Sequence, residues 1–310
     1  SPYLSALILR EADWLSDALQ AAPDDTIAAL IAEAARLDHA TLDRGLRQLK
    51  RRAALVVALA DLGGLWPLHR VTQAWTDFAD ACLKAALITH VGLEARRGKI
   101  PGMTEQDAES FGAGMVALAM GKMGAGELNY SSDIDLICFF DDERFDPADA
   151  MEARTAFIRA TRRMAASLSD TTDEGYVFRT DLRLRPDASV TPVCISLTAA
   201  ERYYEAEGRS WERSAYIKAR PAAGDLAAGA RFLDTLTPFV WRRHLDFSMV
   251  QDTIDMRQKI RDHKGLHGNL KLEGHNMKLG AGGIREIEFF AQTRQLVAGG
   301  RDPALRARRT

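Results

Sequence analysis

Several features are scarce or absent in this chain of 310 residues, and each absence excludes a class of protein. Its three cysteines, Cys82, Cys138 and Cys194, are too few and too far apart for a disulfide framework or a zinc pattern, so we expect a reducing cytoplasm. No apolar run is long enough for a membrane span. The formal net charge is only −2, so bulk charge predicts neither nucleic acid nor a membrane as a partner.

The first residues also lack a basic segment followed by a signal core, and they lack an initiating Met, which indicates a trimmed chain. What is present instead is ordinary globular composition, with 46% hydrophobic and 27% charged residues. This composition predicts a soluble protein with two or three packed units.

The chain is helical in pattern at both ends and mixed in its middle third. From residue 3 to about 98, apolar residues recur at three- and four-residue spacing, which predicts roughly four or five helices, broken at Pro23 and at 63–67. Helical patterns recur at 151–169, 196–207 and 225–237, and helix broken near 265–274 and 280–283 follows; 115–120, 134–140 and 176–185 are typical of strands. We expect an α+β fold with a helical region (1–110), a core (111–222) and a C-terminal helical region (223–310).

Two carboxylates stand behind a glycine-rich turn that begins at Gly121. On a strand, side chains two apart share a face, so Asp133 and Asp135 point the same way while Ile134 and Leu136 enter the core. Adjacent like charges repel unless a cation lies between them, and Mg²⁺ suits oxygen ligands and phosphate. The backbone N–H groups of such a turn can cradle phosphate. The alternative is a glycine turn before a solvated acidic strand end.

A third acid is expected from segment 176–185. Its alternation places Phe178, Leu182 and Leu184 on one face, and Arg179, Asp181, Arg183 and Arg185 on the other. Asp181 can complete a two-metal site or act as a base, and the arginine forks suit phosphate groups. The alternative is a surface ladder of salt bridges.

Two further segments carry basic residues or a glycine turn. Lys218 and Arg220 could add positive charge around a phosphate, or they could form the solvated basic face of a helix. The turn 278–283 opens a helix whose N-terminus would attract anions, although capping and packing explain it equally well. On that helix we expect Ile284, Ile287 and Ala291 on the buried side and Glu288 on a neighbouring stripe.

Four separated blocks, 121–137, 178–186, 211–220 and 278–290, together resemble the bacterial glutamine synthetase adenylyltransferase/deadenylylase family. The resemblance implies a DNA polymerase β-like nucleotidyltransferase core flanked by helical regions. In that family one domain attaches AMP to a tyrosine of glutamine synthetase, and a related domain removes it with phosphate, releasing ADP. Segments 127–129 and 283–288 resemble the N-terminal, deadenylylating half. The family continues beyond residue 310, which implies a fragment.

The resemblance also implies partners and roles. The partners are adenylylated glutamine synthetase, a PII-type signalling protein, nucleotide and phosphate, and the cofactor is Mg²⁺ or Mn²⁺. Alternatives are adenylyl transfer from ATP, or a non-catalytic docking domain. The implied metal ligands are Asp133, Asp135 and Asp181; the implied nucleotide and phosphate contacts are Gly121, Lys122, Ser131, Ser132, Arg183, Arg185, Lys218, Arg220, Lys278 and Arg285, with Glu286 and Glu288 as further candidates.

Overall fold

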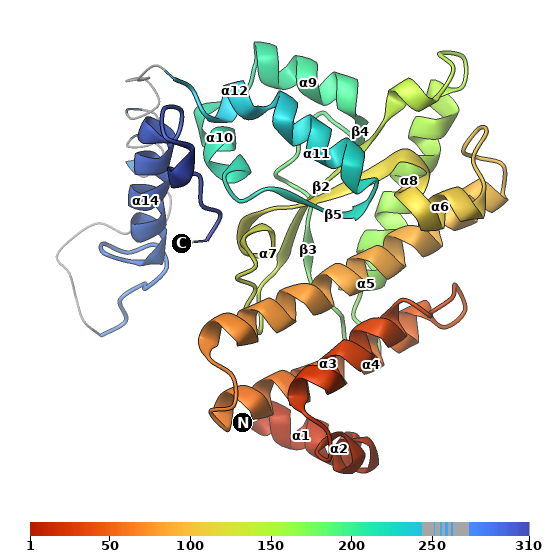
Figure 1. Cartoon of the computed structure of the whole chain (residues 1–310), viewed down its shortest axis with the longest axis vertical. Coiled ribbons are helices and arrows are strands. Elements are labelled where there is room, and N and C mark those ends of the chain that lie inside the picture. Colours follow the sequence, from red (N-terminus) through yellow and green to blue (C-terminus); the bar gives the residue numbers. More distant parts are fainter. Residues whose placement is uncertain (244–250, 252–254, 256–257, 260–261, 263–272, 310) are drawn as a thin grey trace.

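The N-terminal third is a stack of helices. The computed structural model describes residues 1–243, 251, 255, 258–259, 262 and 273–309. In Figure 1 the first helices lie at one end of the molecule, and the long helix α5 runs from them across the sheet. The helical pattern predicted from residue 3 to about 98 is thereby confirmed. Its helices are α1 (Pro2–Arg10), α2 (Ala12–Ala18), α3 (Pro23–Ala34), α4 (Leu42–Leu62) and α5 (Leu68–Arg96).

The middle of the chain forms one mixed sheet of five strands. Strand β2 is central and pairs antiparallel with β1, which in turn pairs antiparallel with β5. The other edge of β2 carries two short parallel partners, β3 at its beginning and β4 at its end. The strands are β1 (Met115–Ala119), β2 (Ile134–Phe140), β3 (Thr180–Asp181), β4 (Cys194–Ser196) and β5 (Arg220–Gly224).

Helices cover both faces of this sheet because β2 is apolar on both sides. Leu136 and Cys138 belong to the core beneath α5 and α8 (Ala150–Ser169), whereas Phe139 packs at 4.8 Å, centroid to centroid, on Phe232 of α11 (Leu226–Thr235). Figure 1 shows the sheet between these helices. The α+β class and strand 134–140 are therefore confirmed, and helices 151–169, 196–207 and 225–237 are confirmed to within two residues. The other α-helices with bounds in the described residues are α6 (Glu105–Phe111), α7 (Gly121–Ala125), α9 (Leu197–Ala206), α10 (Ser210–Tyr216), α12 (Thr237–Val240) and α14 (Ile284–Ala298).

The strand predicted over 176–185 is confirmed only at Thr180–Asp181 and is wrong on both sides of this pair. Only Thr180 and Asp181 pair with β2, and the chain then turns. The guanidinium of Arg185 donates to the carbonyls of Leu182, Ala188 and Thr191, and so closes a loop on itself. Satisfying carbonyls from one side chain removes the need for a strand partner.

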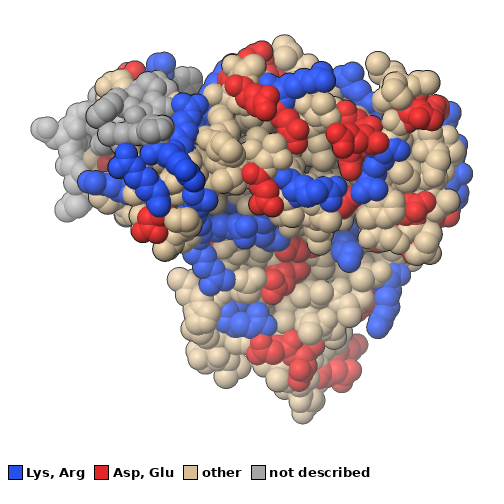
Figure 2. All heavy atoms as spheres, turned by 45° about the horizontal axis from the view of Figure 1, so that its top comes forward, with Lys and Arg blue, Asp and Glu red and all other residues tan. Residues whose placement is uncertain are grey.

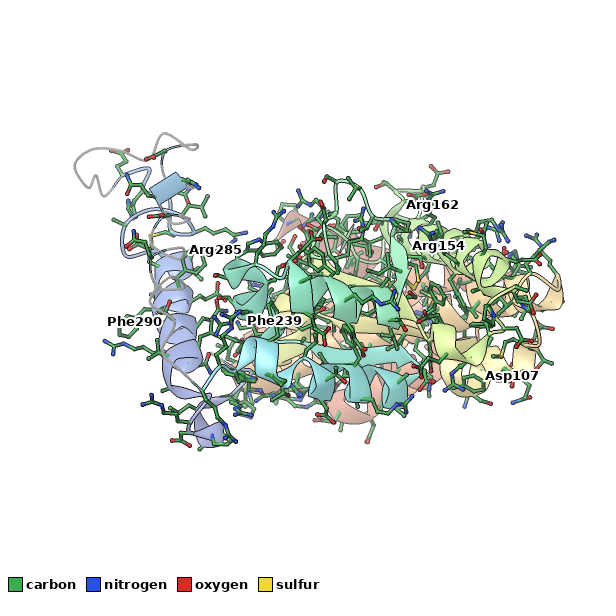
Figure 3. All side chains as sticks on the ribbon, turned by 90° about the horizontal axis from the view of Figure 1, so that it is seen from above. Asp107, Arg154, Arg162, Phe239, Arg285 and Phe290 are labelled. Carbon is green, nitrogen blue, oxygen red and sulfur yellow. The ribbon has the colours of Figure 1, made fainter. Side chains whose placement is uncertain are left out.

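The predicted buried side of α14 is also wrong. Ile284 and Ile287 are 56% and 60% exposed, and Figure 3 shows Phe290 pointing away from the body of the molecule. Glu288 faces the core instead, where it meets Lys218. The predicted breaks at 63–67 and 280–283 are confirmed, whereas most of 265–274 lies outside the described residues. No helix in the described ranges is long and apolar enough to cross a membrane.

Candidate active site

The glycine-rich turn after β1 folds into the short helix α7. Gly121 has φ +52°, and a Cβ there would lie 2.7 Å from Oδ2 of Asp135. A Cβ on Gly124 would lie 2.0 Å from the carbonyl oxygen of Lys218. Without a Cβ, these two glycines let the backbone of α7 pack closely against other parts of the chain. At Gly121 the neighbouring group is the carboxylate of Asp135, a candidate catalytic residue. The sequence predicted a turn here because five residues are too few to show helical periodicity.

Asp135 and Asp181 lie side by side. They are register partners on the parallel strands β2 and β3. Asp133 lies one residue before β2 and is exposed, and its Oδ1 accepts from Nε of Arg179 at 2.5 Å. Ile134 and Leu136 are fully buried, as expected from the alternation. The structure thus gathers the three predicted acids at the beginning of β2 and β3.

The three acids differ in their electrostatic surroundings. Burial raises the pKa of Asp135 to about 6; the negative charges of Asp181 and Asp133 add to the shift, and Arg183 and Lys278 oppose it. The hydrogen bond from Arg183 lowers the pKa of Asp181. Asp135 is therefore the acid whose negative charge is least compensated by the protein.

These residues fit a divalent cation by the chemistry of their donors. Carboxylate oxygens are the ligands that Mg²⁺ prefers, and a cation would offset the repulsion felt by Asp135. As arranged in the described residues, no group of three His, Cys, Asp or Glu side chains converges on a common point that could hold a metal ion. Asp133 and Asp181 are instead engaged by Arg179 and Arg183. The metal site remains a prediction.

The basic residues predicted to bind phosphate lie in different environments. The side chain of Arg183 is 85% exposed, whereas Arg185 is used within its own loop. Arg220 on β5 donates to Asp80 of α5. Lys218 is buried, with Nζ 3.1 Å from Glu288 and 3.6 Å from Glu127. The solvated basic face considered for Lys218 is therefore wrong, because its ammonium joins the core to α14.

The residues of the last block approach the site from α14 and its preceding turn. Lys278 is exposed yet close enough to Asp135 to lower its pKa. Glu286 accepts from the backbone N–H of Gly282 at 2.9 Å, which caps the turn. Arg285 is exposed, with its guanidinium 5.7 Å from the ring centroid of Phe289. On the face drawn in Figure 2, acidic and basic side chains are interspersed, and basic ones gather at the left of the view.

Near the acids, Ser131 is exposed and Lys122 is exposed on α7. The hydroxyl of Ser132 donates to the side-chain oxygen of Asn129. Two residues of this site were not among the predicted site residues. Arg179 binds both Asp133 and the carbonyl of Ser131, and the carboxylate of Glu127 faces Lys218. The alternation that placed Arg179 on the face of Asp181 could have revealed the first, whereas the second depends on tertiary packing.

Comparison with known proteins identifies the family to which the chain belongs. Residues 1–235 match the family model described as Glutamate-ammonia ligase adenylyltransferase, and residues 255–309 match one described as GlnD PII-uridylyltransferase. The whole chain is 52% identical over 316 residues to the bifunctional glutamine synthetase adenylyltransferase/adenylyl-removing enzyme of Bradyrhizobium diazoefficiens, covering 32% of that protein.

Similarly named enzymes of Rhodopseudomonas palustris (strain TIE-1) and Xanthobacter autotrophicus are each 49% identical, again over all of this chain and 32% of theirs. The chain thus spans about a third of the length of these relatives. With most of its length matched by one family model and all of it by these relatives, the chain belongs to the glutamate-ammonia ligase adenylyltransferase family.

Proposed function

We propose that this chain is a nucleotidyltransferase domain of the DNA polymerase β-like type that removes AMP from adenylylated glutamine synthetase by phosphorolysis. The single observation that carries the proposal is the placement of Asp135 beside Asp181, directly behind Gly121. A half-buried acid flanked by two other acids is stabilised when a cation neutralises them, which is the arrangement that phosphoryl chemistry needs.

In the proposed reaction, an oxygen of inorganic phosphate attacks the phosphorus of the tyrosine-bound AMP. The bond from phosphorus to the tyrosine oxygen breaks, the new bond gives ADP, and the tyrosine oxygen takes up a proton. Phosphate and AMP are both anions, so cations must hold them together. Arg183 is exposed and Lys278 lies near Asp135, which supports their use for this purpose.

Asp133, Asp135 and Asp181 would hold Mg²⁺ or Mn²⁺, which when bound would neutralise charge on the transferred phosphoryl group. The protein's own contribution is orientation. Arg179 fixes Asp133 and the carbonyl of Ser131, while Asn129 fixes the hydroxyl of Ser132. Because Gly121 has no Cβ, the backbone there does not cover the carboxylate of Asp135.

The direction of transfer is supported by the sequence of the segment 127–129, which resembles the deadenylylating half of the family. Relatives are named for both activities, so the test must separate them. The chain is incubated with adenylylated glutamine synthetase, phosphate and Mg²⁺, and ADP is measured. In parallel, unmodified glutamine synthetase is incubated with labelled ATP, and label on the protein is measured.

We expect ADP in the first reaction, dependent on phosphate, and no labelling in the second. The double variant Asp133→Asn, Asp135→Asn should release no ADP while retaining its circular dichroism spectrum. Labelling from ATP without ADP release would reverse the assigned direction. No turnover in either reaction by the folded chain, with glutamine synthetase still bound, would favour the docking role.

A further inference from the structure

A cavity of about 600 Å³ lies beside the candidate active site, between the N-terminal helices and the end of the loop that leads to β3. Tyr3, Tyr130, Tyr176 and Phe178 give it an aromatic lining. A smaller cavity of about 340 Å³ shares Tyr3 and Tyr130 with it. The volume is in the range of small-molecule sites, and the aromatic lining suits a planar body.

Lys50 of α4 lines both cavities. The residue is only 9% exposed, and its ammonium lies 3.8 Å from the ring centroid of Phe178 and 4.2 Å from that of Trp75. Within the described residues, Lys50 has neither an ion pair nor a hydrogen bond. The other cations of the larger cavity differ, since Arg10 and Arg51 both bind Glu174.

The aromatic faces attract the ammonium of Lys50 but do not accept conventional hydrogen bonds from it. A cation over a ring gains electrostatic energy, yet a ring face does not replace the oxygen acceptors that three N–H donors prefer. The indole N–H of Trp75, which also lines the smaller cavity, is buried without a partner in the described part of the chain. The cavity walls therefore hold two N–H donor groups, of Lys50 and Trp75, for which the described residues supply no hydrogen-bond acceptor. Burial accordingly lowers the pKa of Lys50 to about 7.

We propose that this cavity binds an organic anion with an aromatic body, its carboxylate or phosphate on Lys50 and its ring against Tyr3, Tyr130 and Phe178. The anion would supply the acceptor that the protein itself does not offer to Lys50. This binding site is separate from the candidate metal ligands and does not depend on the proposed function.

The wall of the cavity is continuous with the chain segment that carries Asp133. Ser131 and Ser132 line its wall and directly precede Asp133. Arg179, which holds Asp133, follows Phe178 in the chain. A ligand that orders this wall would therefore order the segment that presents Asp133.

The test uses benzoate and phenyl phosphate as probes, which distinguish the two anionic groups, and benzyl alcohol as a neutral control. Binding is followed by isothermal titration calorimetry and by tryptophan fluorescence, because Trp75 lies against Lys50. We expect saturable binding of one anionic probe per chain and none of benzyl alcohol. Lys50→Met, which keeps the length of the side chain, should weaken the binding about tenfold or more.

Two further variants make the result decisive. Lys84→Met changes an exposed lysine on α5 and should bind as the unmodified chain does. Tyr3→Ala, at the rim of both cavities and 56% exposed, should fold normally and bind several-fold more weakly. No saturable binding of either anionic probe, or equal binding by folded Lys50→Met, would overturn the proposal.

Discussion

Two sites in this molecule combine carboxylates with basic side chains, but the charges around the central acid differ in sign. In the helical region, Glu94 of α5 is 1% exposed and binds Arg159 and Arg163 of α8, each at 2.6 Å, with Arg97 at 3.7 Å. At the sheet edge, Asp135 has two acids beside it. Breaking the pairing of a buried acid with its arginines costs stability, whereas an acid whose pKa is raised by neighbouring acids is a candidate functional group. From this difference we infer that the cluster around Asp135 is the functional one.

The largest expected effect comes from the sheet edge. Asp135→Asn should lower ADP release by about 10²–10³-fold or more, because it removes a central oxygen donor for phosphoryl chemistry. Its free energy of unfolding in urea should stay the same or rise, because the substitution relieves repulsion from Asp133 and Asp181. Retention of more than a tenth of the activity would remove Asp135 from the site.

The helical cluster should show the reverse behaviour. Glu94→Gln leaves three arginines without their shared carboxylate, and we expect it to lower the free energy of unfolding by roughly 2 kcal/mol. ADP release per folded molecule should be unchanged. Asp142→Asn, on a carboxylate that no arginine binds in the described residues, serves as a control that should cost little. A Glu94 variant that unfolds normally but loses activity would break the comparison.

A smaller effect is expected at Gly121. Alanine there combines φ +52° with a Cβ 2.7 Å from the Asp135 carboxylate, so both stability and activity should fall, stability by about 1–2 kcal/mol. Gly64→Ala is the matched control, because its φ is +69° and nothing lies within 4 Å of the added Cβ. Gly64→Ala should lose only the stability that a positive φ costs alanine, and it should keep full activity. Equal activity losses in both variants would exclude a special role for Gly121.

The smallest effect concerns His90 of α5, whose Nε2 lies 2.8 Å from the hydroxyl of Ser167. Burial lowers the pKa of His90 to about 4, so the unfolded chain, with an ordinary pKa near 6.5, takes up the proton first as pH falls. The stability contributed by neutral His90 is therefore fully present well above pH 6.5 and is lost as pH falls toward 4, by about 0.8 kcal/mol at pH 6. The free energy of unfolding in urea, measured from pH 7 to 5, should fall more steeply for the unmodified chain than for His90→Gln. The same pH dependence in both would contradict the prediction.

The sequence by itself determined the local features. Alternation predicted that Ile134 and Leu136 enter the core, and three- to four-residue spacing predicted the helices of the first hundred residues, because backbone geometry sets both periods. The order of glycine turn, Asp133 and Asp135 gave the catalytic candidates directly. In contrast, the strand over 176–185 was overestimated, because the pattern could not show Arg185 closing a loop onto three carbonyls.

Only the tertiary structure decided which distant groups meet. It placed Asp181 beside Asp135. It paired Asp133 with Arg179, and it buried Lys218 in an ion pair with Glu288 of α14. It also turned Ile284 and Ile287 outward and left Lys50 facing a cavity between aromatic rings. Such pairings join residues tens to more than a hundred positions apart, and periodicity in the chain carries no information about them. The balance of charge around each acid, from which we infer the functional cluster, is therefore a property of the fold.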